Sequence, residues 1–106
     1  MSKQKKITLY FMEIEDAEIR HERSLQMVSH MPMAIHLCFE QFRQMLNPSF
    51  FHEADSVAMA GIVCMMRNCI ELGHDIVLDI DIKRPARYIW ILKEMEQAGA
   101  VIKKVK

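Results

Sequence analysis

The sequence has few of the residues that interrupt regular structure. Its 106 residues include only three glycines and three prolines, so most of the chain is expected to lie in helices and strands rather than loops. A glycine-rich loop that could hold a phosphate group is also missing, which argues against a nucleotide-binding site of that kind. We expect a single domain over residues 1–106.

The sequence also lacks an excess of charge of either sign and lacks long apolar runs. Fourteen basic and fourteen acidic residues give a formal net charge of zero, which disfavours strong non-specific attraction to nucleic acid or to an anionic membrane. No apolar run reaches the roughly 18 residues that a membrane span requires, and the N-terminal residues lack the pattern of a secretory signal. The sequence therefore predicts a cytoplasmic protein without a membrane partner.

Cysteine is scarce, whereas methionine is abundant. Cys38, Cys64 and Cys69 are an odd number without CxxC spacing, a pattern typical of reduced, buried thiols. Ten methionines are an unusually large number for a chain of this length. Methionine fills irregular gaps in a core and suits adaptable contact surfaces.

Hydrophobic periodicity predicts three strands and four helices. The strands are expected over residues 6–14, 74–83 and 100–106, and the helices over 16–31, 32–46, 54–72 and 85–98. Asp16 fits an N-cap, Pro32 and Pro85 fit the first turn of a helix, and Gly73 and Gly99 fit left-handed helix ends. The order is β-α-α-α-β-α-β, an α+β fold that ends in a parallel βαβ unit.

The strand over residues 74–83 predicts how the helices pack. It alternates strictly, with isoleucine and leucine on one face and Asp75, Val77, Asp79 and Asp81 on the other. A half-polar strand of this kind faces solvent on one side. We therefore expect a small three-stranded sheet with helices packed on one face only.

The segment "HMPMAIHLC", residues 30–38, concentrates two histidines, two methionines and a cysteine. On a continuous helix His36 and Cys38 lie about 160° apart, so they cannot share a metal ion. We therefore expect no metal, cofactor or catalytic site here. The same helix places Met33, His36 and Leu37 on one polar face, where they either contact a partner or lie beneath the preceding helix.

Trp90 is the only tryptophan and falls on the polar side of its helix, near Arg87 and Glu94. Tryptophan and arginine are the residues most enriched at interface hot spots. These three residues are candidates for binding a partner protein or a second copy of the chain. The alternative is that a terminus or residues 15–31 cover the tryptophan.

Two charged groups allow other functions. Asp79 and Asp81 point to one face of their strand and could hold a metal ion or act as acid and base, although acidic side chains on a sheet face commonly serve solubility. Lys83, Arg84 and Arg87 surround a helix N-terminus and could bind an anion. The lysines of the two termini could extend this basic group if the first and last strands are neighbours: Lys3, Lys5, Lys6, Lys103, Lys104 and Lys106.

The sequence thus predicts a small non-enzymatic interaction module, an adaptor, inhibitor or regulator that binds another protein and self-associates. The first alternative is a nucleic-acid-associated regulator that uses the basic group at 83–87 and the terminal lysines. The second is a metal-dependent enzyme that uses the paired aspartates.

Overall fold

The sheet is entirely parallel in the part of the chain that the structure describes, residues 6–47 and 51–106 of a computed structural model. The elements follow in the order β1 (Thr8–Met12), α1 (Ala17–Ser29), β2 (Ala34–Cys38), α2 (Phe39–Gln44), α3 (Phe51–Leu72), β3 (Asp75–Asp79), α4 (Pro85–Gln97) and β4 (Val101–Val105). The strand order is β2-β3-β1-β4. The predicted α+β class is confirmed, whereas the predicted three-stranded sheet is wrong, because these residues form four strands.

The additional strand is β2, which occupies the first half of the helix predicted over residues 32–46. Pro32 lies in a turn before it, and the helical segment α2 begins only at Phe39. In β2, Ile35 and Leu37 face the main core while His36 lies on the opposite side, near α1. A strand covered on both faces carries apolar residues on both, so the alternation that identifies exposed strands is weak in it.

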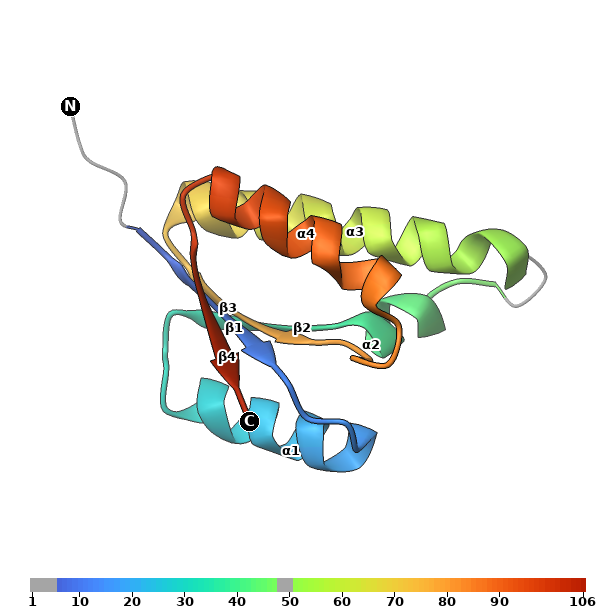
Figure 1. Ribbon diagram of the computed structural model, residues 1–106, viewed down its shortest axis with the longest axis horizontal. Helices are drawn as coiled ribbons and strands as arrows, with labels where there is room; N and C mark the ends of the chain where they lie inside the picture. Colours follow the sequence, from blue (N-terminus) through green and yellow to red (C-terminus); the bar gives the residue numbers. More distant parts are fainter. Residues whose placement is uncertain (1–5, 48–50) are drawn as a thin grey trace.

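Helices cover both faces of the sheet, which corrects the prediction of a one-sided packing. Figure 1 shows α1 on one side and α3 and α4 together on the other. α1 contacts β2 and β3, whereas α3 and α4 contact β3 and β4 respectively. The polar side of β3 is therefore an interior surface: Val77 and Asp79 are both buried.

The main core lies between the sheet and the helices α3 and α4. Its strands contribute large apolar side chains that occupy alternate positions, and α3 and α4 add the side chains of their inner faces. The largest fully buried members include Leu9, Phe11, Phe39, Ile62, Met66, Ile76, Leu78, Ile91 and Met95. The layer between α1 and the sheet contains the buried polar residues Arg20, Ser24 and Asp79, and the candidate site lies there.

The predicted helix boundaries at Asp16, Gly73, Pro85 and Gly99 are confirmed. The Asp16 side chain accepts a hydrogen bond from the Ile19 amide at 3.0 Å, as an N-cap does. Pro85 opens α4, while Gly73 and Gly99 have φ values of 79° and 104° that favour glycine.

Three predicted features need a brief note. The first and last strands are indeed neighbours, since β1 pairs with β4 in register Leu9 to Ile102. Lys3 and Lys5 of the proposed basic group, and Pro48 at the expected end of the second helix, lie outside the described residues. Among the helices of the described residues, none combines the length and apolar character needed to cross a membrane.

Candidate functional site

A cluster of ionisable side chains lies where β2 and β3 end, beneath the first half of α1. Cys38 and Asp79 are the last residues of their strands, and His36 precedes Cys38 by two residues on the same face of the sheet. Arg20 and His21 reach the cluster from α1. The carboxyl ends of parallel strands are where ligands bind in open sheets of this type, especially beside neighbouring strands whose connections leave to opposite faces. β1 and β3 are such neighbours, because β1 leads to α1 and β3 leads to α4 (Figure 1).

Asp79 is the centre of the cluster and is only 2% exposed. Its Oδ1 accepts a hydrogen bond from Arg20 Nε at 2.7 Å. Its Oδ2 lies 3.0 Å from His21 Nδ1 and 3.0 Å from His36 Nε2. Arg20 also donates from Nη1 to the carbonyl of Ile14 at 3.1 Å, which holds the guanidinium against the end of β1. One carboxylate thus joins α1, β2 and β3.

These contacts set the charge of Asp79. Burial alone raises the pKa of a carboxyl group, but the hydrogen bonds from His36, Arg20 and His21, together with the charge of Arg20, lower the pKa of Asp79 from 3.8 to about 2. The group is therefore a carboxylate at neutral pH and can only accept hydrogen bonds. Each imidazole nitrogen that faces it must then carry a hydrogen.

Cys38 is buried beside this carboxylate. Burial raises the pKa of the Cys38 thiol, and the negative charge of Asp79 raises it further, while the backbone amides of Gln41 and Glu40 partly oppose the shift. A thiol with a raised pKa is a poor nucleophile. The cysteine–histidine–aspartate arrangement consequently lacks the activated sulfur that covalent catalysis requires.

The cluster lines the inner part of an open pocket of about 470 Å³, within the range of small-ligand sites. Arg20, His21, Cys38 and Asp79 contribute to its lining. The remaining lining residues come from α1 and α2: Ala17, Glu18, Glu22, Glu40, Gln41 and Gln44. Three of them carry carboxylates. A cation that approaches the cluster through this pocket therefore meets negative charge.

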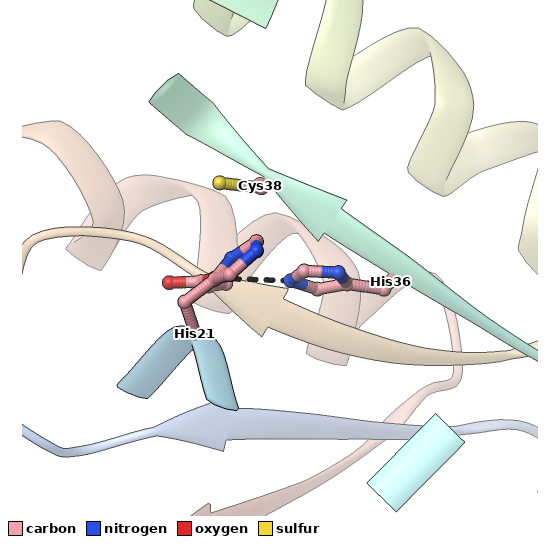
Figure 2. Close-up of side chains that lie close together, drawn as sticks. His21, His36 and Cys38 are labelled. Atoms are coloured by element: carbon pink, nitrogen blue, oxygen red, sulfur yellow. Dashed lines mark hydrogen bonds and ion pairs between the residues drawn. The ribbon is translucent and has the colours of Figure 1, made fainter. Parts of the chain in front are cut away.

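Four residues of the cluster are of the types that bind metal ions. One ligand atom each from His21, His36, Cys38 and Asp79 lies within 4.8 Å of all the others. Figure 2 shows His21, from α1, approaching His36 and Cys38, from β2. The two imidazole ring centres are 5.2 Å apart. The prediction that His36 and Cys38 diverge depended on a helix, whereas on a strand they share one face.

The structure does not bring Met33, His36 and Leu37 together as one contact surface. Met33 is 54% exposed in the turn before β2, whereas Leu37 is 2% exposed and belongs to the main core. His36 faces Asp79 instead of solvent. The alternation of a strand sends adjacent residues to opposite faces, so a grouping based on a helix fails here.

Trp90, Arg87 and Glu94 do lie near one another on α4, on the outer side of the α3–α4 layer. Trp90 is 47% exposed. Arg87 forms an ion pair with Asp55 of α3, and Glu94 forms one with Arg67 of α3. The two ion pairs thus link α4 to α3, one from a residue before Trp90 and the other from a residue after it.

The predicted anion site at 83–87 is accompanied by acidic groups. Lys83 Nζ lies 3.8 Å from Glu15, and Arg87 is paired with Asp55 and stacked over the Phe39 ring at 5.1 Å. Arg84 lines a polar pocket together with three acidic and two basic residues: Glu40, Asp55, Asp81, Arg43 and Arg87. The mixture of charges weakens the attraction for an anion.

Asp79 and Asp81 do not form a pair of carboxylates in one site. Asp79 ends β3 in the buried cluster, while Asp81 lies beyond the strand and accepts a hydrogen bond from the Lys83 amide at 2.9 Å. Asp75, also on the predicted face, accepts one from the Thr8 amide at 2.8 Å. The three aspartates therefore have separate structural roles.

Arg20 and His21 were not predicted as site residues from the sequence. Two features of the sequence indicate them: the apolar stripe of residues 16–31 is thin, and Asp79 directly follows the apolar run of residues 76–78. A buried carboxylate requires a cationic or hydrogen-bonding partner. The inward positions of α1 are in fact occupied by Arg20 and Ser24.

Comparison with models of known protein families, with curated proteins and with solved structures found no match for this chain.

Proposed function

We propose that the protein is a small non-enzymatic interaction module that binds another protein through the groove between α3 and α4. The observation that carries this proposal is the position of Trp90, which is half exposed on the wall of that groove. A tryptophan left in water on a helix surface gains most from burial by a partner.

Three of the side chains that line the groove are small. Ser56 and Ala60 of α3 are one helical turn apart, and Ala86 of α4 is one turn before Trp90. Small residues at helical spacing let another backbone approach closely, and a groove between two helices suits the apolar face of a third. The occupant we propose is therefore an amphipathic helix of a partner protein.

The charged groups around Trp90 support selectivity more than affinity. Arg87 and Glu94 are already paired with Asp55 and Arg67 of α3. These pairs leave an apolar strip between them that a partner can cover without leaving a charge unpaired. A rim of paired charges excludes water from a central aromatic anchor.

An enzymatic function has less support. The cluster around Asp79 contains the residue types of a nucleophilic site, but the thiol of Cys38 is buried and has a raised pKa. Asp79 itself already has Arg20, His21 and His36 as partners. Neither group has the free, activated form that catalysis by these side chains requires.

The test begins with the fluorescence of Trp90, because it is the only tryptophan in the chain. In the free protein we expect a red, easily quenched emission that shifts to the blue when a partner binds. Proteins captured from cell extract by the wild type are then compared with those captured by Trp90→Ala and by Ala60→Arg, which places a long charged side chain in the groove. Each substitution is expected to weaken a genuine partner by about 2 kcal/mol or more, roughly 30-fold.

The matched control is Glu71→Arg, which places the same arginine on an exposed part of α3 about 16 Å from position 60 along the helix. A partner retained equally by wild type, Ala60→Arg and Glu71→Arg would refute the groove. Sedimentation of the isolated chain separates self-association from binding of a different protein. A steep loss of binding to nucleic acid with added salt, independent of Trp90, would instead favour the nucleic-acid alternative.

A further inference from the structure

We propose that His21, His36, Cys38 and Asp79 bind a transition-metal ion of the zinc class between α1 and the sheet. The site lies between α1 and the sheet, and α1 covers the opposite face of the sheet from α3 and α4 (Figure 1). The proposal therefore goes beyond the interaction function and does not depend on it.

The donor atoms are close to the spacing that such an ion needs. In tetrahedral zinc coordination, bonds of about 2.0–2.3 Å separate neighbouring ligand atoms by about 3.3–3.6 Å. Here both imidazole nitrogens are 3.0 Å from Asp79 Oδ2, and all four donor atoms lie within 4.8 Å of one another. The widest of these separations exceeds the tetrahedral spacing by about 1.2–1.5 Å.

The chemistry of the donors selects the ion. Two imidazoles, one thiolate and one carboxylate form a mixed nitrogen, sulfur and oxygen set. Mg²⁺ and Ca²⁺ prefer oxygen ligands, whereas Zn²⁺ takes this combination in tetrahedral sites, with Co²⁺ as a close substitute. Binding replaces the two hydrogen bonds that Asp79 Oδ2 accepts by bonds to the metal. The Cys38 thiol releases its proton to solvent, and each metal-bound imidazole carries its hydrogen on the ring nitrogen that does not bind the ion.

Two surrounding features support metal binding over a purely structural ion-pair network. First, Arg20 Nε holds Oδ1 of Asp79 at 2.7 Å and leaves Oδ2 for the ion, as the groups that orient metal ligands do. Second, the cluster is reached from an open pocket that contains Glu18, Glu22 and Glu40, which attract a cation toward the ligands. The His21 side chain is 38% exposed at this pocket and provides an accessible first ligand.

A bound ion would join three segments that are distant in sequence. His21 belongs to α1, His36 and Cys38 to β2, and Asp79 to β3. α1 has little apolar attachment of its own, because its buried residues are Arg20 and Ser24. The binding energy of the metal therefore adds directly to the attachment of α1 to the sheet.

The test is titration of the metal-free, full-length protein with Zn²⁺ by calorimetry and with Co²⁺ by absorption spectroscopy. We expect one ion per chain, visible absorption typical of tetrahedral Co²⁺, and a sulfur-to-cobalt charge-transfer band. Cys38→Ser should abolish that band. His21→Ala should lower the affinity for Zn²⁺ more than about tenfold. Loss of a residue that only orients a metal ligand already costs about that much.

Matched controls are Cys64→Ser and His30→Ala, which remove the same residue types at exposed positions outside the cluster. These variants should bind as the wild type does. Both variants are expected to fold, because the His21 side chain is partly exposed and Cys38→Ser is nearly isosteric. Circular dichroism is used to check this before titration. Absence of binding in the folded wild type, or binding that His21→Ala and Cys38→Ser leave unchanged, would overturn the proposal and leave the cluster as an ion-pair network.

Discussion

At the scale of single residues, Asp79 connects α1, β2 and β3. It is a buried carboxylate whose three polar neighbours come from two other elements, α1 and β2. No buried side-chain nitrogen or oxygen atom of the described residues lacks a hydrogen-bond partner. A network that is complete in this way stabilises the fold, but it loses much of that stability when one member is removed.

Asp79→Asn is therefore expected to lower the free energy of unfolding by about 3 kcal/mol or more, because it leaves the charge of Arg20 buried without its partner. Urea unfolding of the metal-free protein measures the loss. Glu96→Gln makes the same acid-to-amide change on an exposed surface and should cost less than about 0.5 kcal/mol. Equal losses in the two variants would show that the network contributes little.

Acid should destabilise the metal-free protein through the same residue. The pKa of Asp79 is lower in the folded state, about 2, than its ordinary value of 3.8. Its contribution is therefore complete above pH 3.8 and is lost as the pH falls toward 2, by roughly 2 kcal/mol in total. The side chains that face Asp79 are Arg20, His21, His36 and Cys38.

The measurement is the difference in unfolding free energy between wild type and Asp79→Asn, followed over this acidic range. The difference should shrink as the pH falls, because the wild type loses what the variant never had. A constant difference across the range would contradict the assignment of the lowered pKa to Asp79.

At the scale of elements, α1 and α4 differ in how they are attached. The inner face of α4 buries Ile91 and Met95 completely, whereas α1 buries Arg20 and Ser24 and leaves Ile19 and Leu25 half exposed. Apolar burial contributes about 25 cal/mol per Å², so α4 gains considerably more from packing. α1 depends mainly on its polar bonds to Asp79.

In the metal-free protein the amides of α1 should therefore exchange hydrogen faster than those of α4 at equal intrinsic rates. Hydrogen–deuterium exchange read by mass spectrometry compares peptides that cover residues 17–29 and 85–97. Added Zn²⁺ should slow exchange in α1 selectively. Slower exchange in both helices to the same extent would indicate a general stabilisation instead of a link between α1 and the sheet.

β2 explains why the element order was predicted incorrectly. Residues 34–38 can bury their apolar side chains in the core either as a helix or as a strand. This five-residue pattern therefore does not decide between the two conformations. Pairing with β3, in register Ile35 to Ile76, decides the matter. Sequence patterns are strongest where one face of an element is solvated, as for the helix over residues 85–98.

At the scale of the whole molecule, the sheet separates two surfaces. α3 and α4, which form the groove with Trp90, lie on one side of the sheet, and α1, which covers the cluster around Asp79, lies on the other (Figure 1). Sites that share no contacts act nearly independently, with deviations of about 0.5 kcal/mol or less.

Partner binding and metal binding should accordingly be additive. Trp90→Ala is expected to leave the Zn²⁺ affinity unchanged, and Cys38→Ser is expected to leave partner capture unchanged. Calorimetry measures the Zn²⁺ affinity of Trp90→Ala, and capture from cell extract measures partner binding by Cys38→Ser. A change of more than about fivefold in either direction would reveal coupling through the sheet.

The sequence by itself determined the local features of this protein. Asp16, Pro85, Gly73 and Gly99 fix helix ends because caps and glycine conformations depend only on neighbouring residues. The half-exposed position of Trp90 likewise follows from the period of its own helix.

The tertiary structure alone decided the four-stranded parallel order and the cluster of His21, His36, Cys38 and Asp79. These residues are separated by up to 58 positions along the chain, and no local pattern records which strands become neighbours. Pairing β2 with β3 turned His36 and Cys38 toward Asp79, and the packing of α1 added Arg20 and His21. Contacts between distant segments depend on the free energy of the whole fold, which is why the sequence pattern did not contain this site.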